Sequence, residues 1–540
     1  MRILPIVVFG ALAVALPCSA WAQAPAPVPA NAFRVGAAKI DITPANAAGG
    51  GGMMGGGMGG RRGGPSTAPG AGPATAPGGA MLDTDEALFP VAAPAGPAAG
   101  GAPGAGGAVG GARGAGGGMG GAMGGMGGRG GASGGFPGND GILDHIFSRA
   151  IVIDNGITSA ALVSVDTGSV GEQVWSGLSQ RIEKELGIPA KNLIINPIHT
   201  HSASGGTADQ IFNTIKEAKG KLQPARIGYG TGVSYINVQR NIIDKKTNKW
   251  WEGANYDGQS DKTVAVVKFE SLKGETIAVY FNYACHAVVT GNTDMISGDW
   301  PGEAERYIED SFDDKAVAVS SVGAQGDQNP LYFQQTFDLR DIRIQDYASR
   351  GQDISNAMPP GGQGLNKQDP TVKKLLDQQK MMIKSMGQFM GEEVKRAMRE
   401  MDTPRLATGG RIYAGQKMIS FPGRDRINGN QRAGVEAQYR DGADVQLRLS
   451  LLMLDDIAIA GCDAEIYSMI AVRFKRESPI GRSIFVSMAN GGGNSGYIPD
   501  DASYGQQTFE VLSSRCKPGY AESAIVNGLL DLVADAKRAN

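Results

Sequence analysis

Two histidines close together in the sequence are the first residues whose types and spacing indicate chemistry. His199 and His201 follow the apolar run Leu193–Ile198 and precede a loop of small residues. In an extended chain, side chains two positions apart point to the same side, so both rings are expected to face one space. A single histidine is usually structural, whereas two on one face at a strand end favour a metal site or an acid/base pair.

Other strand-like runs also end in polar residues. His286 follows one such run, Asp463 and Glu465 follow another, and a glycine-rich loop precedes Tyr497. Two histidines and a carboxylate commonly hold a catalytic zinc ion and leave one coordination position for water. Because these residues are too far apart along the chain to form a motif by themselves, they favour a metallohydrolase without establishing one.

The elements expected to position these residues alternate between strands and helices. Runs rich in branched residues predict strands, and apolar residues three and four apart predict helices. Such alternation is typical of an α/β fold, here with a mixed sheet flanked by helices. The expected strands cover residues 33–44, 150–154, 159–165, 193–198, 262–269, 276–284, 316–321 and 447–460, and the expected helices cover 173–186, 208–219, 302–312, 370–401 and 520–538.

The beginning of the chain has the composition of an export signal. Arg2 gives a positive start, Ile3–Leu16 is apolar but short for a membrane span, and Ala20–Ala22 provides a small-x-small cleavage site. Residues 1–22 are therefore expected to be a signal peptide, and the mature protein is expected to be periplasmic or secreted.

A glycine-rich segment interrupts the chain after its first expected strand. Residues 49–138 contain 38 of the 82 glycines, together with alanine, proline and methionine. Because glycine raises chain entropy and offers nothing to bury, this insertion is expected to be disordered, with copper binding by its methionines as the alternative. Residues 23–48 are expected to form a leader and the first strand of a catalytic domain, and residues 139–540 the rest of that domain.

Charge and cysteine content argue against two classes of protein, those that bind nucleic acid and those held together by disulfides. The chain has 51 Lys+Arg and 53 Asp+Glu, a net charge of −2, and so lacks the basic field that binds nucleic acid. Without the signal, three cysteines remain, and an odd number argues against a disulfide framework. Cys285 and Cys462 either form one bridge or act as small buried hydrophobes.

Five segments occur in a fixed order along the chain: Ile40–Thr43, Asp144–Ala150, His199–Ser202, Ser297–Asp299 and Gly326–Pro330. They resemble, in the same order, motifs of the neutral, non-lysosomal ceramidases, and the resemblance covers most of the chain from Phe33 onward. It implies the α/β fold of that family's catalytic domain and a zinc-dependent hydrolase of carbon–nitrogen amide bonds. The family's C-terminal immunoglobulin-like domain is expected to be absent.

The same resemblance implies roles for individual residues. His201 would be the neighbouring acid/base or hydrogen-bonding histidine, and Arg240 would help to hold the carbonyl region of the substrate. His145 lies in a matching segment but not at a ligand position, so it is expected to be structural. The implied zinc ligands are His199, His286, Glu465 and Tyr497.

Two positions depart from the family pattern. A family serine corresponds to Asn329 and a family tyrosine to Phe509, and Phe509 and Asp327 are expected to line the substrate site. If that serine were an essential nucleophile, the chemistry would be lost. If a zinc-activated water attacks instead, Asn329 and Arg240 could stabilise the oxyanion while His201 protonates the leaving amine. We favour the second mechanism.

The expected partner is a small-molecule or lipid-like N-acyl amide. It is either an N-acyl sphingoid base, as the resemblance implies, or a broader N-acyl amide or peptide-like bond, which the changes at Asn329 and Phe509 would permit. Membrane contact without a spanning segment is compatible with both. The alternative function is that of a non-catalytic, metal-stabilised periplasmic binding protein, which the replaced serine would explain.

Overall fold

The structure is a computed structural model that describes residues 31–45, 141–203, 206–244, 249–354, 360–401, 405–428, 437–493 and 495–539. The expected signal peptide and the glycine-rich insertion lie outside these residues. Within these ranges, no helix combines the length and the apolar character needed to cross a membrane.

The largest element of the fold is an eight-stranded mixed sheet. The β9–β10 and β3–β4 pairs are parallel, and the other neighbours are antiparallel. Every residue of β3, β4 and β10 is buried, because both faces of the sheet are covered. In spatial order the strands are β10 (Val317–Val322), β9 (Thr276–Tyr283), β8 (Thr263–Ser271), β5 (Gln223–Val233), β1 (Arg34–Asp41), β2 (Phe147–Asp154), β3 (Ser159–Val165) and β4 (Leu193–Pro197).

A second, four-stranded sheet packs against the first. Its apolar side chains, such as Leu452 and Ile459, share one core with Ile151 and Leu162 of the large sheet. The region 447–460 contains parts of two antiparallel strands, joined by a turn in which Asp455 has a φ of 55°. The strands are β12 (Ile412–Arg426), β13 (Tyr439–Leu454), β14 (Ile457–Cys462) and β16 (Arg482–Ser487).

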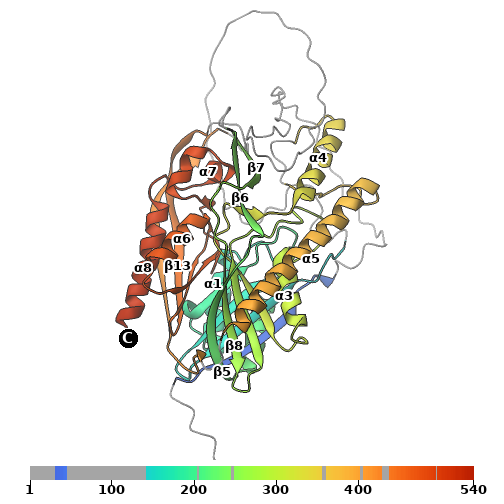
Figure 1. Ribbon diagram of the computed structural model, residues 1–540. Helices are drawn as coiled ribbons and strands as arrows, with labels where there is room; N and C mark the ends of the chain where they lie inside the picture. Colours follow the sequence, from blue (N-terminus) through green and yellow to red (C-terminus); the bar gives the residue numbers. More distant parts are fainter. Residues whose placement is uncertain are drawn as a thin grey trace, which may run out of the picture.

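Helices cover the outer faces of both sheets. Apolar faces of α1 and α2 pack on β1–β4, those of α3 and α5 on β8–β10, and those of α6 and α8 on the second sheet (Figure 1). The mixed-sheet α/β class predicted from the sequence is thereby confirmed. The helices are α1 (Glu172–Leu186), α2 (Ala208–Gly220), α3 (Asp299–Asp310), α4 (Gln334–Ser349), α5 (Pro370–Arg399), α6 (Ser468–Glu477), α7 (Phe509–Ser513) and α8 (Ala521–Arg538).

Strand β5 was not predicted, and its glycines explain why. Gly228, Gly230 and Gly232 alternate along the strand, and a Cβ on each would lie 2.2, 2.8 and 2.3 Å from side-chain atoms of Leu406, Met401 and Glu393. Glycine ordinarily weakens a strand, so the residue pattern did not favour a strand there. The close approach of helix α5 and the segment after it makes glycine necessary there.

Two small sheets carry residues implied in the site. The first contains β11 (Gln328–Pro330), β6 (Asn237–Asp244) and β7 (Lys249–Asn255), and the second contains β15 (Glu465–Ile466) and β17 (Tyr497–Ile498). Most of their short strands come directly after a strand of one of the two larger sheets in the sequence. They therefore hold short polar segments close together above a rigid core.

The cysteines of the described residues do not form bridges. Cys285, Cys462 and Cys516 are free and buried. Burial raises the pKa of each thiol, so all three are protonated at neutral pH. Cys285 and Cys462 therefore do not form a bridge, and both are small buried hydrophobes, which is the second of the two alternatives.

Candidate metal centre

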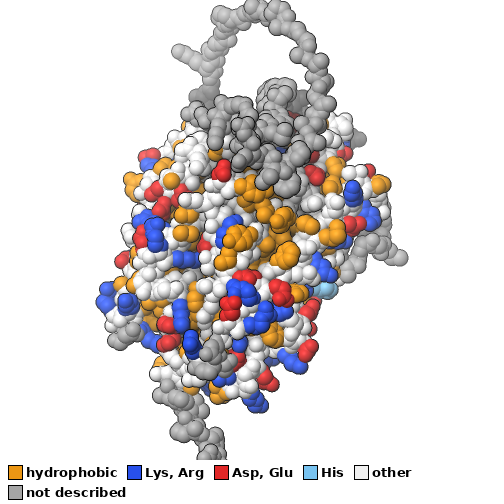
Figure 2. All heavy atoms as spheres, in the orientation of Figure 1, with side chains coloured by type: hydrophobic (Ala, Val, Ile, Leu, Met, Phe, Trp, Pro, Cys, Tyr) orange, Lys and Arg blue, Asp and Glu red, His pale blue; other side chains and the backbone are white. Residues whose placement is uncertain are grey.

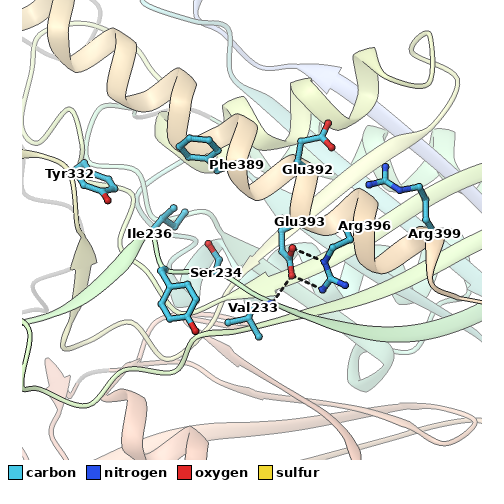
Figure 3. Close-up of a pocket in the computed structure, with 10 residues that line it drawn as sticks. Val233, Ser234, Ile236, Tyr332, Phe389, Glu392, Glu393, Arg396 and Arg399 are labelled. Carbon is cyan, nitrogen blue, oxygen red and sulfur yellow. Dashed lines mark hydrogen bonds and ion pairs between the residues drawn. The ribbon is translucent and has the colours of Figure 1, made fainter.

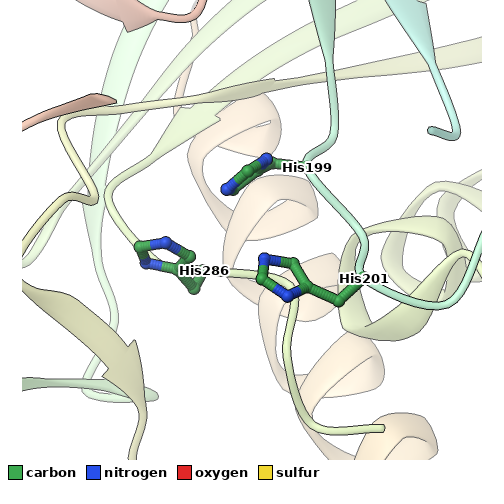
Figure 4. Close-up of side chains that lie close together, drawn as sticks. All are labelled: His199, His201 and His286. Carbon is green, nitrogen blue, oxygen red and sulfur yellow. The ribbon is translucent and has the colours of Figure 1, made fainter. Parts of the chain in front are cut away.

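Three histidine side chains from two loops converge at the end of the large sheet. The ring centroid of His199 lies 5.1 Å from that of His201 and 5.2 Å from that of His286, and the His201 and His286 centroids are 6.2 Å apart. Each ring offers a nitrogen, and these atoms all lie within 4.8 Å of one another. The three side chains point toward a common space (Figure 4).

The backbone reaches this arrangement by a turn rather than by an extended strand. Strand β4 ends at Pro197, and His199 has a φ of 61°, in the left-handed region. The extended geometry used to predict that His199 and His201 share a side is therefore wrong at His199, although the two rings do meet. A left-handed conformation in a non-glycine residue is costly and is characteristic of functional sites.

The loops that carry the histidines are fixed side by side. Thr200 forms a parallel β-bridge with Ala287, and the His201 amide donates to the Ala287 carbonyl at 3.4 Å. The Thr200 hydroxyl also donates to the carbonyl of Ser297 at 2.9 Å. Segments that are almost ninety residues apart in sequence are thus held in one register.

Backbone carbonyls orient two of the rings. Nδ1 of His199 lies 2.7 Å from the carbonyl oxygen of Gly168, and Nδ1 of His286 lies 3.0 Å from that of Gln328. Each Nδ1 therefore carries the proton in the neutral ring, which leaves Nε2 as a lone-pair donor. This is the arrangement by which proteins orient histidine ligands toward a metal.

The carboxylate of Glu465 completes a buried cluster with unused polar atoms. Its Oε2 atom lies 3.5 Å from Nε2 of His199 and 3.4 Å from Nε2 of His286. All three atoms are buried and have no hydrogen-bond partner among the described residues. Buried polar atoms are normally satisfied. The donor set therefore fits a metal cation, which would satisfy all three atoms together.

The protonation states agree with this fit. Burial by itself would lower the pKa of His199, but Glu465 raises it overall. Burial and the charge of Arg240 lower the pKa of His286. Burial would raise the pKa of Glu465, yet the two imidazoles hold it well below its usual range. At neutral pH, Glu465 is ionised and His286 is neutral, which are the forms that bind metals.

His201 is exposed, whereas His199 and His286 are buried. The protein around it and the two neighbouring imidazoles lower its pKa. This side chain is consequently neutral at neutral pH and lies where a ligand entering from solvent would meet it.

Tyr497 lies beside Glu465, as the family resemblance implied. Strands β15 and β17 pair in parallel with these two residues opposite each other. Burial raises the pKa of Tyr497, so its hydroxyl is neutral at neutral pH. The ring of Phe509 packs edge-to-face on Tyr497 with centroids 5.6 Å apart, and it stacks on Trp250 at 6.2 Å. Phe509 thus belongs to an aromatic wall of the site.

Arg240 and Asn329 lie on neighbouring strands of the small sheet. Nη1 of Arg240 donates to Oδ1 of Asn329 at 3.4 Å, and the guanidinium carbon is 5.2 Å from the Tyr497 ring centroid. The Asn329 Nδ2 donates to Glu252 at 2.8 Å, which leaves one of its two N–H groups for another acceptor. Both residues are almost fully buried.

Asp327 and His145 lie apart from the cluster. The carboxylate of Asp327 accepts hydrogen bonds from the amide and hydroxyl of Ser468, at 2.7 and 3.0 Å. Burial raises the pKa of Asp327 to about 7. His145 is exposed and pairs with Asp41 at 2.8 Å. Neither contact involves the three histidines.

A surface hollow of about 440 Å³ is lined in part by residues 233–236, a few positions before Arg240 in the sequence. Tyr235, Tyr332 and Phe389 line it, together with the ion-paired Glu393 and Arg396 of α5. Figure 3 shows Phe389, Glu393 and Arg396 on one helix and Tyr332 on a neighbouring segment. Hydrophobic side chains also gather in the middle of the face shown in Figure 2, where Figure 1 labels β6 and α5. The hollow contains none of the histidines, so it is separate from the candidate centre.

Sequence reasoning missed the partners that orient the site. Gly168 and Gln328 act through backbone carbonyls, which leave no signal in residue type. Glu252 and Glu510 contact Asn329 and Arg240 through their side chains. Only the pairing of distant strands reveals these contacts.

Comparison with known proteins agrees with the architecture and the motifs. Residues 207–337 match the model for "Neutral/alkaline non-lysosomal ceramidase, N-terminal". The neutral ceramidase of Drosophila pseudoobscura pseudoobscura is 27% identical over 198 residues, which is 32% of this chain and 28% of that protein. The neutral ceramidase of Pseudomonas aeruginosa is 25% identical over 208 residues, 34% of this chain and 31% of that protein.

The fold extends the match beyond the aligned sequence. The crystal structure of neutral ceramidase from Pseudomonas aeruginosa superimposes with a TM-score of 0.54 at 16% identity, over 74% of this chain and 70% of that chain. The sequence matches span less than a third of the curated relatives named above.

Fold and site together define an α/β protein with a histidine group that could hold a metal ion. More particularly, residues 207–337 resemble the neutral/alkaline non-lysosomal ceramidases, and the fold resembles that of a neutral ceramidase.

Proposed function

We propose that this protein is a zinc-dependent hydrolase of carbon–nitrogen amide bonds, with N-acylated lipid amides such as N-acylsphingosine as its first substrate class. One observation carries the proposal. The Nε2 atoms of His199 and His286 and the Oε2 atom of Glu465 meet in a buried space without other partners. The family relationship supports hydrolysis as the reaction.

Zinc is the metal that suits these donors best. Imidazole nitrogens with a single carboxylate are typical ligands of catalytic zinc, whereas magnesium and calcium prefer oxygen ligands alone. His199, His286, Glu465 and Tyr497 would hold the ion. When bound, zinc supplies Lewis acidity, which polarises a carbonyl group and activates a water molecule.

The remaining steps belong to side chains of this chain. The buried guanidinium of Arg240 would donate to the carbonyl oxygen of the substrate, where negative charge develops, and the second N–H of Asn329 would assist. His201, neutral and open to solvent, would take up a proton and pass it from an imidazole nitrogen to the leaving amine. The aromatic wall of Phe509 and Trp250 would exclude water from one side.

Asn329 in place of the family serine bears on the nucleophile. An amide side chain cannot form an acyl intermediate, so water is the attacking group in this proposal. The same replacement, together with Phe509, supports a substrate range that includes simpler N-acyl amides and peptide-like bonds. We also propose that the protein is exported, since residues 1–22 have the composition of a signal peptide.

A single set of measurements tests the function. Purified protein with one equivalent of zinc is incubated with N-dodecanoylsphingosine in detergent micelles and with fluorogenic N-acyl amides, with and without a chelator. Hydrolysis that stops on chelation and returns with zinc is the expected result. Stoichiometric zinc without turnover of any amide would favour the metal-stabilised binding protein, which Asn329 supports if it replaces a catalytic serine, as the resemblance implies.

A further inference from the structure

A fully buried acidic side chain holds Arg240 from the side away from Asn329. One carboxylate oxygen of Glu510 accepts a hydrogen bond from Nε of Arg240. Its other oxygen accepts from the hydroxyl of Tyr467 at 3.1 Å. Neither Glu510 nor Tyr467 has any exposed surface. Both carboxylate oxygens are therefore engaged, and the carboxylate cannot rotate without losing a bond.

The contacts of Glu510 come from segments that also carry the candidate centre. Glu510 lies in the first turn of α7, immediately after Phe509 of the aromatic wall. Tyr467 lies two residues after Glu465, and its hydroxyl is also 3.1 Å from that of Thr508, which caps α7. The carboxylate that holds Arg240 is thus tied to the segment that presents Glu465.

The guanidinium of Arg240 is held at several points. Nε binds Glu510, Nη1 binds Asn329, and the plane lies near the ring of Tyr497. The buried Nη2 atom has no hydrogen bond of normal geometry to the described residues. An arginine presents a planar fork, so fixing Nε and Nη1 also fixes the direction of Nη2. A donor with a fixed direction can stabilise developing charge without reorganising.

We propose that Glu510 is a positioning residue, which aims the guanidinium of Arg240 at the carbonyl group of the substrate, and that Tyr467 fixes Glu510 in turn. This inference rests on the proposed amidase function. The negative charge of Glu510 also compensates the buried guanidinium of Arg240, which would otherwise be unfavourable. Simple compensation would affect only stability, whereas positioning affects catalysis and requires Arg240 to be present.

The first test compares Glu510→Gln and Tyr467→Phe with Glu270→Gln. Glu270 is a suitable control because it is also buried and paired with an arginine, Arg226 at 2.9 Å, at the opposite end of β9 from His286. We expect Glu510→Gln to lower kcat/KM on N-dodecanoylsphingosine roughly 10- to 100-fold, as lost supporting contacts do. Zinc content should stay at the level of the parent protein, and the melting temperature should fall no further than in Glu270→Gln.

A double-mutant cycle then separates positioning from a structural effect. If Glu510 acts through Arg240, Glu510→Gln should change kcat/KM less than about twofold in an Arg240→Met background, because coupled residues are not additive. A further tenfold loss in that background would overturn the proposal. Activity of Glu510→Gln equal to that of the parent protein would overturn it as well.

Dodecanoate binding distinguishes failure of this inference from failure of the proposed function. If the parent protein hydrolyses no amide, the proposed function fails, and the affinity for dodecanoate measured by calorimetry still reports on Arg240. Glu510→Gln should then bind this carboxylate at least tenfold more weakly than Glu270→Gln does. Equal affinities would overturn the positioning of Arg240.

Discussion

The backbone carbonyl of Gln328 accepts two hydrogen bonds from His286, one from its amide nitrogen and one from Nδ1, both at 3.0 Å. The same acceptor therefore fixes the main chain and the ring of one histidine. Because Gln328 lies on β11, which pairs with the strand of Arg240, the ring direction depends on the small sheet. The candidate metal centre and the proposed oxyanion donors, Arg240 and Asn329, are thus parts of one hydrogen-bonded structure.

Replacement of His286 by alanine should remove the metal and the activity together. The change deletes one of two buried imidazoles that share Oε2 of Glu465. We expect zinc measured by plasma emission to fall from about one per chain to a small fraction, and turnover to fall roughly a thousandfold or more, since zinc catalysis needs its protein ligands. His145→Ala, at an exposed site, serves as the control, and a fully active His286→Ala protein would refute the assignment.

Gly326 should not tolerate a side chain. Its amide donates to the Ile466 carbonyl at 2.8 Å, and a Cβ would lie 2.9 Å from that oxygen and 3.1 Å from the Tyr467 ring. Gly326→Ala should therefore destabilise the fold by about 1–3 kcal/mol, the usual cost of overpacking, and weaken zinc binding. Urea unfolding measures the first effect and a zinc-dye competition the second.

Gly481→Ala is the matched control for that substitution. A Cβ at Gly481 would meet no atom within 4 Å, so the change should be within about 0.5 kcal/mol of the parent protein. Equal unfolding midpoints for the two alanine variants would contradict the packing argument.

Zinc affinity should fall as the pH is lowered from 8 to 6. Glu465 raises the pKa of His199 above its usual value, so the metal-free protein carries a proton on this ring in mildly acidic solution. Zinc must displace that proton, and the apparent dissociation constant should rise about tenfold per pH unit below the pKa. Calorimetry in buffers of different ionisation enthalpy should detect the released proton. An affinity independent of pH would show that His199 is not a ligand.

Asp327→Asn should change the pH dependence of stability. Burial raises the pKa of Asp327 to about 7, so the folded protein retains a proton that the unfolded chain loses near pH 4. The folded state binds more protons, and ionisation between pH 4 and 7 therefore costs stability as the pH rises. Asparagine can keep the contacts to Ser468 without titrating.

We expect the melting temperature of Asp327→Asn, relative to that of the parent protein, to increase from pH 5 to about pH 7 and then to level off. The corresponding difference in the free energy of unfolding should grow on the order of 1 kcal/mol per pH unit up to pH 7. Parallel melting curves across this range would mean that the carboxyl group is already ionised at pH 5.

The sequence predicted those parts of the structure that depend on local patterns. The runs 159–165 and 193–198 are rich in branched residues and form strands within one residue of the expected limits. His199 and His286 were identified because each follows such a run. By contrast, strand β5 was not predicted, since the need of its glycines for close packing against α5 appears only in the folded protein.

The sequence by itself therefore determined the α/β class, the histidines after the strands and the resemblance to ceramidases. Only the tertiary structure decided that Nε2 of His199 and His286 face Glu465, that Gly168 and Gln328 orient the rings, and that Glu510 holds Arg240. The physical reason is range. Strand and helix patterns arise from neighbouring residues, whereas these contacts join segments separated by tens to hundreds of residues, whose meeting depends on the packing of both sheets.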